Sequence, residues 1–154
     1  MLNQPITTDV YFLFKTPEAF EAFVAKFGGD ESKRLAATAH HTTFKVQIGE
    51  TYYKLQAIKI GFYQTVEECL DSFDFTICQL AANKGKLYVG QYTTWDLARK
   101  RLALHKLNSC AASVLRRLKY TKQGFTACQG CIVSLLRAVG DDPALFNPHV
   151  QYLD

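Results

Sequence analysis

Two aspartates lie inside runs of large apolar residues, where acidic side chains are uncommon. Asp9 precedes the apolar residues 10–14, and Asp74 lies between Phe73 and Phe75. A buried strand seldom contains a carboxylate that has neither a partner nor a function. Carboxylates on two neighbouring strands can share Mg²⁺, which suits phosphoryl or nucleotidyl transfer. We therefore predict Asp9 and Asp74 as catalytic and Mg²⁺-binding residues, with a strand-end or capping role as the open alternative.

The second candidate site is basic. Residues 84–123 contain ten Lys and Arg residues against one acidic residue, whereas residues 1–75 contain seven against ten acidic ones. On a helix, Arg116, Lys119 and Tyr120 share one face. Arginine pairs with phosphate through two hydrogen bonds and tyrosine stacks on bases, so this face could hold a nucleotide or a nucleic-acid strand. The predicted binding residues are Arg116, Arg117, Lys119, Tyr120 and Lys122, and a solvated helix face is the alternative.

The five cysteines favour reduced thiols over a disulfide framework, because their number is odd and their positions are scattered. Cys128 and Cys131 have the spacing of half a zinc site or of a redox pair, and two small buried thiols are the alternative. Reduced cysteines predict a cytoplasmic protein. No apolar run reaches the roughly 18 residues that cross a bilayer, so no membrane association is expected.

Hydrophobic periodicity and turn residues predict the elements that position these side chains. The apolar positions 20, 23, 24 and 27 follow Pro17 at helical spacing and precede two glycines. In chain order we expect a strand at residues 9–14, a helix at 17–27, a hairpin of strands at 41–48 and 52–60, a short helix at 65–72, paired strands at 73–78 and 86–89, and three helices from residue 93 with breaks near 108–109 and 124.

The chain has 154 residues, of which 48% are hydrophobic and 21% charged, values that exclude disordered and collagen-like proteins. This length predicts a single domain over residues 1–154, with a sheet-containing part at 1–92 and a helical part at 93–154. The element order predicts an α+β fold, in which helices back a mixed β-sheet. Gly-rich phosphate loops and the HExxH and GxSxG motifs are missing, which argues against P-loop proteins and common hydrolases.

Four segments occur in an order and spacing that indicate one family. They are the strand at residues 9–14 with its helix, the strand at 53–58, the segment 73–79 and the basic segment 117–125. Together they resemble poorly characterised nucleotidyltransferase-fold proteins of phages and large DNA viruses. In that family an Asp-x-Asp strand follows a Gly-Gly or Gly-Ser turn, and a later strand adds a third carboxylate. The resemblance implies that Asp9 matches the first Asp and Asp74 the third, with Mg²⁺ as cofactor.

Two departures from the family pattern shape the expected function. Tyr11 stands where the family has its second Asp, and the eight residues before Asp9 leave no room for the upstream strand and Gly turn. We expect a reduced, catalytically silent relative in the host cytoplasm that binds nucleic acid, a nucleotide or a protein partner through its basic helices. The alternative is an active Mg²⁺-dependent nucleotidyltransferase that adds a nucleotide to a hydroxyl acceptor. A second copy or a partner chain would then complete the sheet at its exposed first strand.

Overall fold

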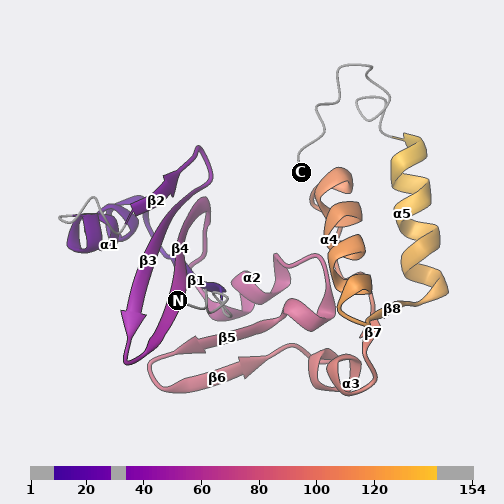
Figure 1. Ribbon diagram of the computed structural model, residues 1–154. Coiled ribbons are helices and arrows are strands. Elements are labelled where there is room, and N and C mark those ends of the chain that lie inside the picture. Colours follow the sequence, from indigo (N-terminus) through magenta and orange to yellow (C-terminus); the bar gives the residue numbers. More distant parts are fainter. Residues whose placement is uncertain (1–8, 29–33, 142–154) are drawn as a thin grey trace. The chain divides into compact units, whose positions relative to one another are not determined.

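The computed structural model describes residues 9–28 and 34–141 (Figure 1). The chain divides into two compact units, which we call unit 1 (Met1–Thr65) and unit 2 (Val66–Asp154). Each unit has its own cluster of buried apolar side chains. The division falls at residue 65, whereas the sequence pattern changes from strands to helices at residue 92. That the two units behave as a single domain stays a prediction.

Unit 1 combines a four-stranded sheet with one helix. Its elements are β1 (Asp9–Phe14), α1 (Pro17–Gly28), β2 (Arg34–Ala37), β3 (His41–Ile48) and β4 (Thr51–Phe62). The strand order is β1-β4-β3-β2, in which β1 runs parallel to β4 and the other pairs are antiparallel. Within the described sheet, β1 is therefore an edge strand.

Helix α1 forms because its first turn is capped and one of its faces is aromatic. Thr16 Oγ1 accepts a hydrogen bond from the backbone amide of Ala19 at 3.2 Å. The ring of Phe23 packs on Phe12 of β1, with centroids 4.7 Å apart. The apolar face of α1 thus covers the sheet around the fully buried Phe44.

Unit 2 consists of helices joined by short strands. Its elements are α2 (Val66–Asp71), the 3₁₀ helix η2 (Thr76–Cys78), β5 (Leu80–Asn83), β6 (Lys86–Val89), α3 (Thr93–Ala98), β7 (Arg101–Leu102), α4 (Cys110–Lys122), β8 (Thr126–Ala127) and α5 (Gln129–Asp141). Lys84 and Gly85 connect β5 to β6 with φ angles of 47° and 74°, as a type I′ turn requires. None of the helices in the described residues has both the length and the apolar character to cross a membrane.

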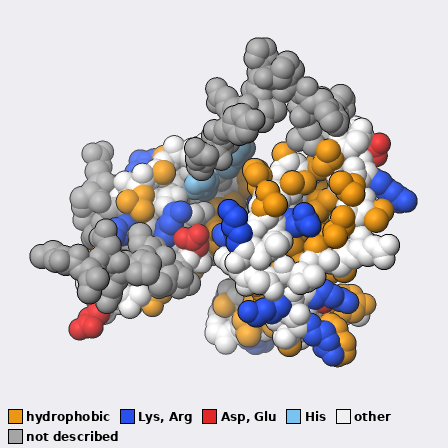
Figure 2. All heavy atoms as spheres, turned by 45° about the vertical axis from the view of Figure 1, so that its right-hand side comes forward, with side chains coloured by type: hydrophobic (Ala, Val, Ile, Leu, Met, Phe, Trp, Pro, Cys, Tyr) orange, Lys and Arg blue, Asp and Glu red, His pale blue; other side chains and the backbone are white. Residues whose placement is uncertain are grey.

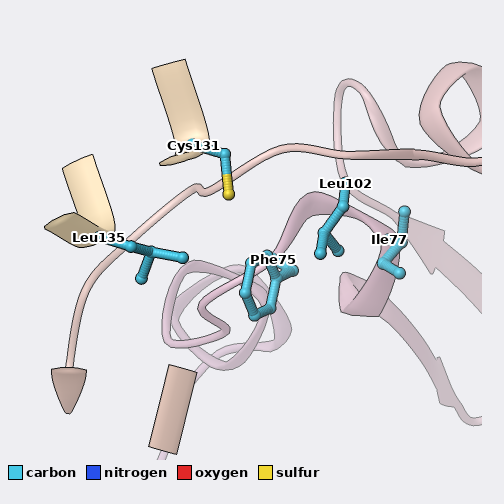
Figure 3. Close-up of a cluster of buried hydrophobic side chains, with 5 residues drawn as sticks. All are labelled: Phe75, Ile77, Leu102, Cys131 and Leu135. Carbon is cyan, nitrogen blue, oxygen red and sulfur yellow. The ribbon is translucent and has the colours of Figure 1, made fainter. Parts of the chain in front are cut away.

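The core of unit 2 lies where the segment around η2 meets β7 and α5. Phe75, Ile77, Leu102, Cys131 and Leu135 are buried there and gather in one cluster (Figure 3). Half-buried side chains of α4 pack against the same cluster. These contacts attach the two long C-terminal helices to the segment that follows α2.

The predicted α+β class with a helical C-terminal part is confirmed, but the predicted strand at 73–78 is wrong. Phe75 forms only an isolated bridge with Leu104, and residues 76–78 form η2. The backbone of this segment bonds to residues 103–106 instead of to a neighbouring strand. The strand at 86–89 consequently pairs with β5. The short exposed strand β2 was not predicted.

Helix α4 also turns a different face inward from the one its leucines predict. The sequence places Val114, Leu115 and Leu118 in a buried row, yet Leu115 is 60% and Leu118 is 49% exposed. The buried positions of α4 are Cys110 and Ser113. The contacts of Cys110 and Ser113 set the orientation of α4. Leu115 and Leu118 consequently remain on the surface of the protein.

Candidate functional site

Asp74 lies in a buried ion pair rather than on a sheet strand. Its side chain is 2% exposed, and its Oδ2 accepts hydrogen bonds from Arg116 Nη1 at 2.8 Å and from Ser113 Oγ at 3.0 Å. Its backbone carbonyl accepts hydrogen bonds from the amides of His105 at 2.7 Å and Lys106 at 3.3 Å. Through these hydrogen bonds, Asp74 connects the segment before η2 to α4 and to the loop that precedes α4.

Arg116 balances the charge of Asp74 and still reaches solvent. Burial acts to lower the pKa of Arg116, but the hydrogen bond and negative charge of Asp74 outweigh burial and raise it. The guanidinium consequently stays charged throughout the physiological pH range. Its side chain is 55% exposed, so part of it remains available for a phosphate.

Asp9 lies in unit 1, at the exposed start of β1. The residues opposite Asp9 and Tyr11 on β4 are Lys54 and Gln56, and no residue of β4 is acidic. Within residues 9–28 and 34–141, no three His, Cys, Asp or Glu side chains lie together as potential metal ligands. Mg²⁺ prefers carboxylate oxygens, which these surroundings do not supply. Mg²⁺ binding by Asp9 and Asp74 stays a prediction that the donor set does not favour.

Tyr120 is part of the core of unit 2. Its ring packs edge-on against Phe75 and Phe125, with centroids 5.9 Å and 6.0 Å away. Its hydroxyl lies 3.0 Å from Cys78 Sγ, and burial raises the pKa of the phenol. The next predicted binding residue, Arg117, is half-buried, and its Nε has no hydrogen-bond partner in the described part of the chain. The Tyr120 ring is therefore occupied by core contacts, not displayed beside Lys119.

Cations without an acidic partner in the described residues surround the C-terminal end of α4. Lys119 and Lys122 are exposed in its last turn. Lys100 Nζ lies 3.6 Å from the position that a Cβ on Gly124 would take, just after α4. Figure 2 shows Lys and Arg side chains, in blue, close together on the lower part of the face in view. We call Lys100, Lys119 and Lys122 the basic surface.

A second buried carboxylate, Asp96, was missed as a positioning residue. It is fully buried on α3 and accepts hydrogen bonds from Thr76 Oγ1 at 2.6 Å and from Arg101 Nε at 2.7 Å. The signal was present in the sequence, because Asp96 is the one acidic residue in the basic half and lies between Trp95 and Leu97. Asp96 holds α3 against η2 and fixes the guanidinium of Arg101, whose side chain stays 44% exposed.

A surface pocket of about 270 Å³ lies in unit 2 beside α2 and the start of α3. Its lining residues are Glu67, Leu70, Asp71, Gln79, Gly90, Gln91, Tyr92 and His105. His105 Nε2 lies 2.9 Å from one carboxylate oxygen of Asp71, and Lys106 Nζ lies 3.3 Å from the other. The hydrogen bonds from His105 and Lys106 lower the pKa of Asp71. The sequence did not indicate this pocket, because its lining comes from separate segments.

Comparisons with known proteins address family and fold. The model of a family described as "Gabija anti-defense 2 family protein" matches residues 2–100. No curated protein matches the chain. Among solved structures, a tRNA-processing enzyme in its apo form 2 is similar in fold, with a TM-score of 0.54 and 21% sequence identity over 92% of this chain. The matched region makes up 44% of that enzyme's chain, so this likeness concerns less than half of the enzyme.

Proposed function

The chain belongs to the Gabija anti-defense 2 family, and on this basis we propose that it counteracts the Gabija defense. We propose that it acts in the host cytoplasm as a catalytically silent, nucleotidyltransferase-like protein that binds nucleic acid through its basic surface. Membership in a phage anti-defense family agrees with the resemblance to phage nucleotidyltransferase-fold proteins. The fold shared with a tRNA-processing enzyme supports the same assignment.

The ion pair of Asp74 with Arg116 is the main observation in support of a catalytically silent protein. A carboxylate that serves a catalytic Mg²⁺ must direct its oxygens at the ion. The Oδ2 of Asp74 instead accepts hydrogen bonds from Arg116 and Ser113. Transferring this carboxylate to a metal would leave the charge of Arg116 without its partner. Lys54 opposite Asp9 adds a positive charge where a second metal ligand would be needed.

The basic surface supports binding of a polyanion. Lys100, Lys119 and Lys122 are exposed, and none forms a salt bridge with the described residues. Clustered exposed cations attract nucleic acid because binding releases the counterions condensed on the phosphates. The remaining cations of this half, such as Arg101 and Arg116, are held by buried carboxylates. Arg101 and Arg116 are thus fixed by the fold, although part of Arg116 stays exposed, whereas the three lysines are free to contact a ligand.

Replacing both Lys119 and Lys122 with Ala should weaken the binding of a fluorescently labelled single-stranded oligonucleotide, measured by anisotropy over a series of salt concentrations. Each lost phosphate contact removes about 0.7 from the slope of log K against log salt. The double variant should therefore have a slope that is shallower by roughly 1.4. Plaque formation on a Gabija-carrying host should fall in parallel.

The matched control removes the same charge from unit 1. Lys15 and Lys26 are exposed beside β1 and in the last turn of α1. The Lys15→Ala/Lys26→Ala variant should keep the wild-type slope. If both double variants lower affinity and slope equally, binding depends on net charge alone and the basic surface has no special role.

The second candidate function is an active Mg²⁺-dependent nucleotidyltransferase that uses Asp9 and Asp74. Calorimetric titration of Mg²⁺ or Mn²⁺ with a nucleoside triphosphate should give no saturable heat in the wild type or in Asp9→Asn. Asp9 is exposed, so its replacement should leave the fold intact. Saturable metal-assisted nucleotide binding that disappears in Asp9→Asn would support the active enzyme and contradict the catalytically silent role.

A partner chain is also part of the proposal. Within the described sheet β1 has a neighbouring strand on one side only, and an open edge can accept a strand from a second copy or another protein. The exposed Leu115, Leu118 and Leu136 add apolar surface in unit 2. These features favour an assembly of the protein with another chain.

A further inference from the structure

Helix α3 presents two aromatic rings and a guanidinium on one exposed face. Tyr92 at the N-cap, Trp95 and Arg99 follow one another at spacings that place them on the same side. Trp95 is 54% and Tyr92 53% exposed. We propose that Trp95 and Arg99 form a stacking platform for a base of single-stranded nucleic acid. The inference rests on the nucleic-acid binding proposed above and adds the strand type and the contact.

The opposite face of α3 fixes its orientation. Thr93 and Asp96 are fully buried. Thr93 Oγ1 donates a hydrogen bond to the carbonyl of Thr76 at 2.7 Å, and Asp96 accepts from Thr76 Oγ1 and Arg101 Nε. A helix this short does not form by itself in water, so these buried bonds determine where its outer face points. The exposure of Trp95 is thus built into the fold.

The guanidinium of Arg99 stacks on the indole of Trp95. Its guanidinium carbon lies 3.2 Å from the centroid of the Trp95 ring, a distance typical of face-to-face stacking. The guanidinium lies over the indole, and the 54% of the Trp95 surface that stays exposed is the part available to a base. Base stacking does not depend on base identity, because every base has a π face. The platform should therefore bind single strands with little sequence preference.

Lys100 supplies positive charge next to the platform. Its φ of 48° lies in the left-handed region, which glycine adopts freely and which disfavours residues with a Cβ. The chain nevertheless has lysine here, and its side chain extends to Gly124 beyond the end of α4. Lys100 follows Arg99 directly in the chain, so it adds positive charge to the segment that carries the platform.

Trp95 is the one tryptophan of the chain, so its fluorescence reports the proposed contact directly. The probe is an oligonucleotide of about 20 thymidines, longer than common single-strand sites, compared with the same strand in a duplex with oligo(dA). The single strand should quench Trp95 strongly and the duplex weakly. Trp95→Ala should weaken binding of the single strand on the order of 10-fold, and Trp95→Phe should retain most of it. Tyr52→Ala is the matched control, since Lys45 Nζ lies over that exposed ring in unit 1 at 4.3 Å.

Anisotropy of the labelled strand separates this inference from the proposed function. If the strand binds the wild type and Trp95→Ala with equal affinity and does not quench Trp95, the platform is contradicted. Binding by the basic surface would not be contradicted by that result. Equal quenching by strand and duplex would also overturn it, because bases inside a duplex cannot stack on a protein ring. No binding at about 50 mM salt would overturn both proposals. If the Ala variant folds poorly, quenching of wild-type Trp95 by the single strand against the duplex keeps the test decisive.

Discussion

Replacing Arg116 with Ala should lower the free energy of unfolding by about 2–3 kcal/mol. The change leaves the Asp74 carboxylate at 2% exposure with Ser113 as its remaining side-chain donor. Removing one member of a fully buried pair costs roughly 3–5 kcal/mol, and the half-exposed Arg116 reduces this value. Urea denaturation followed by Trp95 fluorescence measures the loss.

Lys119→Ala is the matched control, because Lys119 is exposed on the same helix and forms no salt bridge with the described residues. It should change stability by less than about 0.5 kcal/mol. Should Arg116→Ala prove as mild as Lys119→Ala, the ion pair adds nothing to stability. Asp74 would then be available for another role, including the metal binding that the silent model rejects.

Phe75→Ala should destabilise unit 2 by about 3–5 kcal/mol, the cost of a large cavity at a packed aromatic position. Phe75 is fully buried, and its ring meets Tyr120 edge-on. The core of unit 1 contains none of these residues and is built around Phe44 instead. Hydrogen exchange measured by mass spectrometry should therefore increase across residues 66–141 and stay unchanged in β3 and β4.

The conservative variant Phe75→Leu separates cavity size from loss of the ring, and it should destabilise unit 2 less than Phe75→Ala. Equal loss of protection in both units would contradict the expectation of separate cores. In that case the chain would unfold as the single domain that its length predicts.

The elements with strong local signals could be predicted from the sequence. The four periodic apolar positions of α1, the turn before Thr51 and the cap of α4 each depend on neighbouring residues. Ser109, for example, accepts a hydrogen bond from the Ala112 amide at 3.4 Å. The helix predicted from residue 93 to the break near 108–109 is wrong beyond Ala98, where α3 ends and residues 101–102 form β7. The local signals do place β1, α1, the β3–β4 hairpin, α4 and α5 within a few residues. Tertiary contacts only adjust their ends.

The candidate site depended on contacts that a single sequence does not contain. Asp74 lies in an apolar run that resembles a strand, but its partner Arg116 is 42 residues away. Leu115 and Leu118 have helical core spacing, yet the contact of Ser113 with Asp74 sets the inward face of α4. Buried hydrogen bonds between distant residues thus outweighed the local hydrophobic pattern at both places. Trp95 gave no signal of its own, because exposure cannot be derived from its neighbours.

The position of the cysteines has a consequence for chemical reactivity. All five lie in unit 2, and unit 1 has none. Burial raises the pKa of the Cys69, Cys78 and Cys131 thiols. Alkylating reagents and oxidants attack the thiolate, so these sulfurs react slowly while the protein is folded. The alkylation rate of these three thiols therefore reports how often unit 2 opens, whereas opening of unit 1 leaves no trace in the same reaction.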